Sequence, residues 1–259
     1  MKIINMVFLI LYLFMNFGCD QQNVLVTAHR GASGYAPENT LSSISVAIEL
    51  GADFAELDAQ ETADGEIVLL HDKTLKRTTG IEKNIWEVNY SELNSIDAGS
   101  WYNEKFKGEP IPKLSEVIDL VNGKMKLNIE LKTNGHEKEL ADRVVKIIED
   151  SKFTGNCILT SFDFAQIDRA KEINPNLKVG YIFKTIPSDI DVFKANVNLL
   201  SVHYSLVNKD FMKKSIENNK AVYVWTVNDV VEMKRLIDLG VSSIITNYPD
   251  VLKKIIEER

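Results

Sequence analysis

Residues 54–59, Phe-Ala-Glu-Leu-Asp-Ala, form a short, largely apolar segment that predicts a buried β-strand. Seven further segments of this kind alternate with amphipathic stretches that predict helices. The predicted strands are Val24–Ala28, Phe54–Ala59, Lys126–Leu131, Cys157–Ser161, Lys178–Phe183, Leu199–Tyr204, Ala221–Val227 and Ser243–Asn247. The predicted helices include Thr40–Leu50, Glu137–Asp150, Phe164–Ile173, Asp210–Asn218 and Val230–Leu239. This alternation predicts an α/β fold, a closed (β/α)8 TIM barrel, with a doubly wound open sheet as the alternative.

The bulk composition narrows the choice of class. The chain has 259 residues, 45% of them hydrophobic, which suffices for one large domain or two small ones. Its net charge of −7 argues against a general nucleic-acid surface, so no nucleic-acid partner is expected. No Gly-x-Gly-x-x-Gly motif follows the first predicted strand, which weakens a dinucleotide-binding interpretation.

The N-terminus resembles a bacterial lipoprotein signal. The short apolar run Ile3–Met15 suits the core of a signal peptide, and Gly18-Cys19 resembles the site where cleavage leaves a lipidated cysteine. Asn16 departs from the leucine usual in that pattern, and an ordinary secretory signal is the alternative. We therefore expect an exported lipoprotein, anchored to a membrane on the periplasmic or cell-surface side. The expected parts are a signal peptide (1–18), a lipidated tether (19–23) and the barrel (24–259).

With Cys19 lipidated, Cys157 has no partner for a disulfide. It lies in a predicted strand, where a buried and inert thiol is the expected state.

Residues 73–113 interrupt the alternation of strands and helices. They contain scattered aromatic residues and end in Pro110-Ile111-Pro112. We predict a small insertion after the second strand that packs over one mouth of the barrel. Its aromatic residues either line the rim of a pocket or form a satellite core, and the second interpretation is favoured. They are Trp86, Tyr90, Trp101, Tyr102 and Phe106. Farther along, the link 186–198 leaves room for a brief helix only.

Two acids occupy one face of the second strand. Glu56 and Asp58 are two positions apart, so their side chains point the same way, about 6–7 Å apart along the strand. Two acids on one face of a central strand are costly without a cation, and metal ligation removes that cost.

The residues Asp64-Gly65 predict a two-residue hairpin turn. In that register Ala63 pairs with Glu66, and Asp58 lies opposite His71 with Cβ atoms about 4.5–5.5 Å apart. A bulge would shift this pairing. Such closeness is expected to raise the pKa of His71 and to suit it to proton donation.

Further polar residues follow two other strands. His29 and Arg30 come at the end of the first strand, and Glu130 and Lys132 at the end of the third. By alternation, Glu130 and Lys132 face the barrel interior together with Asn128. A structural salt bridge between Glu130 and Lys132 is the alternative, but it leaves the acids of the second strand unexplained.

These motifs together resemble the glycerophosphodiester phosphodiesterase family, in their order and spacing. The matching segments are His29-Arg30-Gly31, Pro37-Glu38-Asn39-Thr40, Gly51-Ala52-Asp53, Glu56-Leu57-Asp58, Thr62-Ala63-Asp64-Gly65, His71-Asp72, Asn128-Ile129-Glu130-Leu131-Lys132 and Val224-Trp225-Thr226-Val227-Asn228. The resemblance covers essentially all of Val24 to Lys254. Small departures occur at Ala59 and at Gln60-Glu61, outside the catalytic set.

The resemblance implies a (β/α)8 barrel with a small insertion after the second strand. It implies one divalent cation on Glu56, Asp58 and Glu130, and acid–base roles for His29 and His71. It also implies that Arg30 and Lys132 bind phosphate. Because all the protein ligands are oxygen atoms, the cation is expected to be Mg²⁺ or Ca²⁺.

Five other residues carry weaker evidence for a role. A surface role is expected for His136, and a rim or core position for His203, with the pocket as the alternative. Trp225 ends the seventh strand, where it either walls the substrate site or packs structurally. Asn39 or Thr40 is expected to cap the helix that follows.

The predicted activity is hydrolysis of small-molecule glycerophosphodiesters to sn-glycerol 3-phosphate and an alcohol. The nucleophile is either water or a neighbouring hydroxyl of the substrate. One alternative is a lysophospholipase D or a phospholipase C-like enzyme on the same barrel. Another is a lipoprotein that binds glycerophosphodiesters without cleaving them, which the presence of both histidines disfavours.

Overall fold

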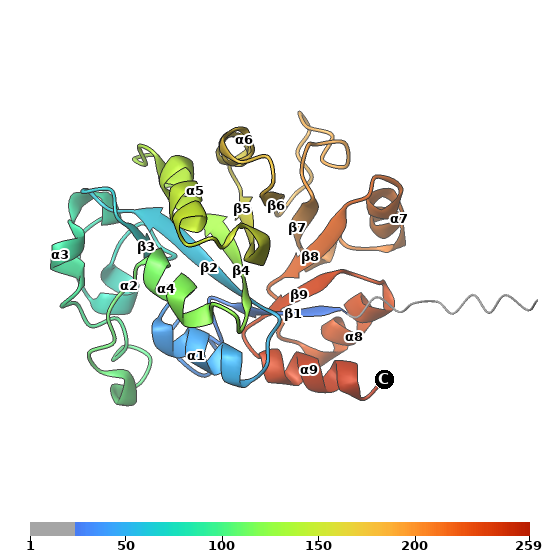
Figure 1. Ribbon diagram of the computed structural model, residues 1–259. Coiled ribbons are helices and arrows are strands. Elements are labelled where there is room, and N and C mark those ends of the chain that lie inside the picture. The colour runs from blue at the N-terminus through green and yellow to red at the C-terminus, as the bar shows by residue number, and fades with distance from the viewer. Residues whose placement is uncertain (1–23) are drawn as a thin grey trace, which may run out of the picture.

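The structure is a computed structural model, and it describes residues 24–259. Eight parallel strands form a closed barrel, because β1 pairs with β2 on one side and with β9 on the other. Helices surround the barrel on the outside (Figure 1). The predicted (β/α)8 barrel is confirmed, and the open sheet is excluded. The predicted signal peptide and Cys19 lie outside the described residues.

The observed elements agree closely with the predicted segments. The barrel strands are β1 (Leu25–His29), β2 (Phe54–Glu61), β4 (Lys126–Leu131), β5 (Cys157–Ser161), β6 (Lys178–Phe183), β7 (Leu199–His203), β8 (Ala221–Trp225) and β9 (Ser243–Thr246). The outer helices are α1 (Leu41–Glu49), α4 (Leu114–Val121), α5 (Leu140–Asp150), α6 (Phe164–Ile173), α7 (Lys209–Glu217), α8 (Val230–Asp238) and α9 (Pro249–Glu257). Two 3₁₀ helices, η3 (Thr154–Asn156) and η4 (Tyr204–Leu206), lie in loops. Residues 184–198, between β6 and β7, form turns and no helix.

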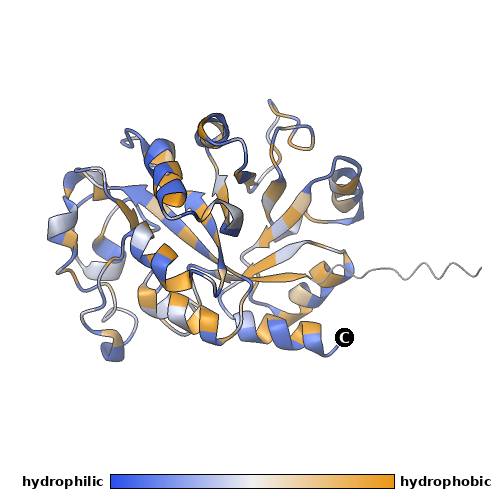
Figure 2. Cartoon of the chain, in the orientation of Figure 1, coloured by the Kyte–Doolittle hydropathy of each residue, from blue (hydrophilic) through white to orange (hydrophobic). Residues whose placement is uncertain are grey.

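Alternation along each strand divides the core into two layers. Leu127, Ile129 and Leu131 of β4 are buried against the helices, where each contributes about 1.5–3 kcal/mol of hydrophobic stabilisation. Side chains on the opposite face of the strands point into the barrel and form a separate apolar cluster there. Its members are Phe54, Ile158, Leu199, Tyr223 and Ile245. In Figure 2 the outer helices alternate hydrophobic and hydrophilic residues, as expected for helices with one face on the barrel.

The hairpin after β2 departs from the predicted register. β3 (Ile67–Leu69) pairs antiparallel with β2, and the Leu70 amide donates to the Asp58 carbonyl at 3.0 Å. Asp58 therefore lies opposite Leu70, and the predicted pairing with His71 is wrong by one residue. The loop has three residues because Thr62 and Glu66 close it, with Gly65 at a φ of 84°. Such a loop adds a bulge and shifts the register.

The insertion, residues 73–113, lies at one side of the barrel, next to β2 and β3 (Figure 1). It contains α2 (Lys76–Thr79), η1 (Ile85–Glu87), α3 (Tyr90–Leu93) and η2 (Glu104–Phe106). Leu75, Ile85 and Leu93 belong to a satellite core on which Trp86 and Tyr90 pack. The satellite-core interpretation of these two aromatic residues is therefore confirmed. None of the five insertion aromatics lines the cavity at the carboxyl ends of the barrel strands, which is described below.

Candidate active site

A cavity of about 200 Å³ opens at the carboxyl ends of the barrel strands, where TIM barrels carry their active sites. Most of the residues singled out from the sequence line it. The lining comprises His29, Arg30, Glu56, Asp58, His71, Asn128, Glu130, Lys132, Thr160, Phe162, Ile182, Ser201, Trp225, Thr226 and Ile245.

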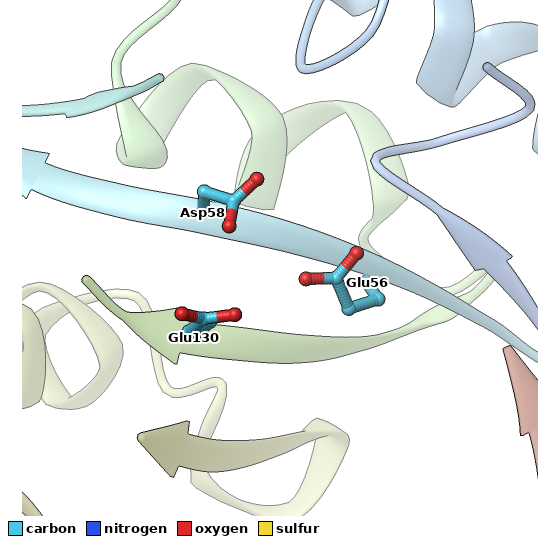
Figure 3. A group of neighbouring side chains, drawn as sticks. All are labelled: Glu56, Asp58 and Glu130. Atoms are coloured by element: carbon cyan, nitrogen blue, oxygen red, sulfur yellow. The ribbon is translucent and has the colours of Figure 1, made fainter. Parts of the chain in front are cut away.

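Strand register brings the three acids together. β2 and β4 run parallel, with Asp58 beside Glu130, and Glu56 precedes Asp58 by two residues on the same face. One oxygen from each carboxylate lies within 4.8 Å of the others, and the three side chains converge in Figure 3. All three residues are buried, with at most 8% of their surface exposed. Carboxylates gathered at this spacing are suited to holding one hard cation.

Basic groups neutralise this acidic cluster only in part. Lys132 Nζ lies 3.3 Å from Asp58 and 3.0 Å from Glu130, and Arg30 Nε lies 3.4 Å from Asp58. Burial raises the pKa of Asp58, but Lys132 and Arg30 outweigh it and bring that pKa to about 2. Burial and the charge of Asp58 raise the pKa of Glu130 to about 7. Burial and both neighbouring acids raise the pKa of Glu56 well above its usual value.

The Glu130–Lys132 salt bridge, which was the alternative interpretation of these residues, is present, but it does not compensate the charge of the whole cluster. Glu56 accepts the backbone N–H of Arg30 at 3.0 Å, and His29 Nε2 is 4.0 Å away. Two of three buried acids thus resist ionisation in the protein alone. A divalent cation would supply the missing positive charge, so the residues present fit such an ion.

His29 is held at the end of β1, with Glu56 beside it in the strand register. Its Nδ1 lies 2.7 Å from Oδ1 of Asn247, so Nδ1 carries the proton and Nε2 is left for proton exchange. Burial and the charge of Arg30 lower the pKa of His29 to about 4. The imidazole is therefore neutral at pH 7.

His71 follows β3 and reaches the same cavity, although it is not paired with Asp58. Its Nδ1 donates to Oδ1 of Asp72 at 2.7 Å, which leaves Nε2 free. Burial, together with the charges of Arg30 and Lys132, lowers the pKa of His71 although Asp58 and Asp72 oppose the shift. The predicted rise is wrong in sign, because burial and two cations outweigh the carboxylates.

The backbone of Arg30 adopts a left-handed conformation, with a φ of 53°, and Gly31 follows at 77°. This turn directs the Arg30 amide at Glu56 and its guanidinium at Asp58. A Cβ at Gly31 would lie 2.4 Å from the Ser43 hydroxyl, so glycine is required there. Such local strain is common at functional sites.

Asn39 is a site residue that the sequence analysis missed. Thr40 caps α1, whereas the Asn39 side chain donates to Asp58 Oδ2 at 2.9 Å and accepts the Asp58 amide at 3.1 Å. Its φ of 58° explains the asparagine, which tolerates the left-handed region better than most residues. Two features of the sequence could have identified Asn39: the motif Pro37-Glu38-Asn39-Thr40 of the family resemblance, and the presence of two adjacent capping residues where one suffices.

The rest of the cavity wall combines apolar side chains with the amide of Asn128 and the hydroxyls of Thr160, Ser201 and Thr226. Phe162 and Trp225 meet edge to face, with ring centroids 5.7 Å apart, and Ile182 and Ile245 continue the wall. Trp225 thus lies where a substrate wall was expected. His203 is absent from the lining and lies behind Trp225, with 5.5 Å between their ring centroids.

The two remaining predictions for single residues are confirmed. His136 is exposed and stacks on Trp86, with ring centroids 4.0 Å apart. Cys157 is buried, and burial raises the pKa of its thiol to about 12, so it stays protonated.

Comparisons with known proteins agree on one family. The model of the "Glycerophosphoryl diester phosphodiesterase family" matches residues 29–251. A glycerophosphodiester phosphodiesterase of Caldanaerobacter subterraneus subsp. tengcongensis is 34% identical over 242 residues, covering 90% of this chain and 98% of the relative. One of Bacillus subtilis is 30% identical, covering 90% and 86%. The solved structure of an Oleispira antarctica phosphodiesterase, in complex with the product sn-glycerol-3-phosphate, is similar with a TM-score of 0.85 and 30% identity, covering 90% and 96%.

Proposed function

The chain belongs to the glycerophosphoryl diester phosphodiesterase family and is an enzyme of glycerophosphodiester hydrolysis, and we propose that it works by metal-dependent acid–base catalysis between His29 and His71. The products would be sn-glycerol 3-phosphate and an alcohol. The observation that carries the proposal is the convergence of three buried acids, two histidines and two cationic side chains on one cavity.

Glu56, Asp58 and Glu130 would hold one divalent cation, Mg²⁺ or Ca²⁺. When bound, such a cation acts as a Lewis acid on the phosphoryl group. Arg30 and Lys132 border the same acids and would bind the phosphate oxygens, stabilising the charge of the transition state.

The two histidines divide the proton transfers. A water molecule or a neighbouring substrate hydroxyl attacks phosphorus, and its proton passes to one imidazole as the bond to the alcohol oxygen breaks. Attack by the hydroxyl would give a cyclic phosphate, which water would then open to sn-glycerol 3-phosphate. We assign this acceptor role to His29, because its pKa of about 4 keeps it neutral. His71 would protonate the leaving alcohol from Nε2, because Asp72 holds its Nδ1–H. It must first take up that proton, since burial, Arg30 and Lys132 lower its pKa against the opposing effect of Asp58 and Asp72.

The test is product analysis with a panel of glycerophosphodiesters, with and without a chelator. We expect sn-glycerol 3-phosphate and free alcohol, and loss of both after verified metal removal. Full activity in metal-free protein would refute the assignment of the acidic cluster to a cation.

Lysolipids are the second class of candidate substrate, in a lysophospholipase D or phospholipase C-like reaction. The apolar wall formed by Phe162, Ile182 and Trp225 is the observation that favours them. Including lysolipids in the same panel separates the two classes by their relative kcat/KM.

The cellular location is also a proposal. The run ending at Gly18-Cys19 supports export and lipidation at Cys19. Among residues 24–259, no helix is long and apolar enough to cross a membrane. Mass spectrometry of the mature protein should find a lipidated Cys19 at the N-terminus, and Cys19→Ser should abolish lipid labelling. An unmodified N-terminus at another residue would overturn the proposal.

A further inference from the structure

Arg77 is a charged residue of the insertion that reaches the edge of the active site without lining its cavity. It lies in α2, and its guanidinium binds two carboxylates at once. Nε donates to Asp72 Oδ2 at 2.7 Å, and Nη2 lies 3.3 Å from Asp72 Oδ1. Nη1 and Nη2 donate to the two oxygens of Glu38 at 2.8 and 2.7 Å. This is a bidentate fork on Glu38 combined with a second carboxylate, a geometry that lysine cannot reproduce.

The Asp72 carboxylate connects Arg77 to the catalytic apparatus. Its Oδ1 accepts the Nδ1–H of His71 at 2.7 Å, and this bond fixes the tautomer that leaves Nε2 free. The hydrogen bonds from Arg77 lower the pKa of Asp72 to about 2, so the carboxylate remains an acceptor at neutral pH. Among the described residues, Arg77 and His71 supply the side-chain hydrogen bonds to this carboxylate.

Glu38 anchors the other side of Arg77 to the barrel. It lies in the loop between β1 and α1, and it also accepts Arg30 Nη1 at 2.8 Å. Only 12% of the Glu38 side chain is exposed, against 40% for Arg77, so this is not a loose surface pair. The insertion is therefore joined to the barrel mouth by a chain of charged groups running from Arg30 through Glu38 and Arg77 to Asp72.

We propose that Arg77 is a positioning residue for the reaction, which holds the Asp72–His71 pair in its catalytic orientation from the insertion. The proposal rests on the proposed function, since it assigns the consequence to the proton transfer by His71. Arg77 touches neither the cavity nor the acidic cluster, so its effect must pass through other residues. The insertion then contributes to catalysis although none of residues 73–113 lines the cavity.

The experiment is a double-mutant cycle with the most active glycerophosphodiester of the panel. Arg77→Ala should lower kcat about 10- to 100-fold, because small misplacements of a catalytic group have effects of that size. In a His71→Ala background, where there is no imidazole to position, Arg77→Ala should lower kcat less than about threefold. Lys76→Ala is the matched control, because Lys76 is the adjacent residue in α2 and its ion-pair partner within residues 24–259 is the exposed Glu82. Its kcat should stay within about twofold of the wild type.

A merely structural role predicts a different pattern. If Arg77→Ala lowers kcat as strongly without His71 as with it, the positioning role is overturned. The same holds if Arg77→Ala keeps wild-type kcat. Should Arg77→Ala fail to fold, as judged by circular dichroism and its Tm, Asp72→Asn tests the same link. Its kcat should fall about 10- to 100-fold with His71 present and less than about threefold without it. An inactive wild type would instead refute the proposed function, so the two failures are distinguishable.

Discussion

The two halves of the barrel mouth differ in chemistry. The half built on β1, β2, β3 and β4 supplies every ionisable residue of the cavity lining, whereas the half built on β5 to β9 supplies apolar residues, hydroxyls and Trp225. Charges gathered against a low-dielectric wall interact more strongly than they would in water. The comparison teaches that a substrate bound across this mouth would meet charged groups in one half and mainly apolar groups and hydroxyls in the other. Our hypothesis is that bond cleavage belongs to the first half and alcohol recognition to the second.

Among the changes considered, removal of the metal should cause the largest loss of activity, because it acts on the charged half of the barrel mouth. Because three carboxylates would share one cation, its loss should remove several kcal/mol of transition-state stabilisation, about 10³-fold in rate. Activity is measured after chelation, with the metal content verified, and then after Mg²⁺ or Ca²⁺ is restored. Phe162→Ala, in the apolar half, should keep the same dependence on the cation.

Loss of either histidine should have the next largest effect. His29→Ala and His71→Ala should each lower kcat about 10²- to 10⁴-fold, which is the usual worth of a positioned acid or base. Cation binding should largely survive, as measured by calorimetry.

His136→Ala and His203→Ala are the matched controls, since neither residue lines the cavity. Both should retain kcat within about threefold of the wild type. Near-normal turnover in either active-site variant would remove that histidine from the mechanism.

Substitutions in the apolar half should lower activity less than those in the charged half, and their effect should depend on the substrate. Phe162→Ala and Trp225→Ala should change kcat/KM by about 2- to 10-fold, corresponding to aromatic contacts of about 0.5–1.5 kcal/mol. The change should depend on the alcohol group of the substrate, as judged across the panel. Ile186→Ala is the control, because Ile186 is 52% exposed and outside the lining. An equal loss for every alcohol would contradict the division between the halves.

The smallest expected effect is on stability. Burial and Asp58 raise the pKa of Glu130 from 4.5 to about 7. Folded protein therefore binds more protons at Glu130 than unfolded protein between these values, so this residue makes stability fall as pH rises. His29, whose pKa is lowered, contributes the opposite slope below pH 6.5.

The comparison of wild type with Glu130→Gln isolates the effect of Glu130. In metal-free protein, the gain in Tm of this variant should be larger at pH 7.5 than at pH 5 by about 5–10 °C, because the two pKa values correspond to roughly 2 kcal/mol over this range. A gain that is equal at both pH values would show that the charge of Glu130 is compensated without a cation.

Local patterns predicted most of the fold. β4, β5 and β6 and helix α6 begin and end at the predicted residues, because their apolar residues recur at the period of the element and turns flank them. The ends of β1, β2, β7, β8 and β9 differ from the predicted ends by one or two residues, because hydrophobic periodicity does not define the last paired residue of a strand.

The same patterns, with the family resemblance, identified the acids, the histidines and the cationic residues that now line one cavity. The local patterns failed to predict the register of the hairpin after β2, where one long-range contact competes with a local preference. Asp64 accepts hydrogen bonds from the Thr62 hydroxyl and from the Tyr90 amide of the insertion, and the turn has three residues in place of two. The one-residue shift that follows separated His71 from its predicted partner.

The sequence by itself determined the barrel, the identity of the charged residues and the face of each strand on which they lie, since alternation is a local property of the chain. Only the tertiary structure decided which residues meet. Parallel pairing placed Asp58 beside Glu130 and His29 beside Glu56, and loop packing brought Asn39 to Asp58 and Arg77 to Asp72. The pKa directions were likewise decided there, because burial and charges from distant segments set them, and no spacing along the chain encodes either.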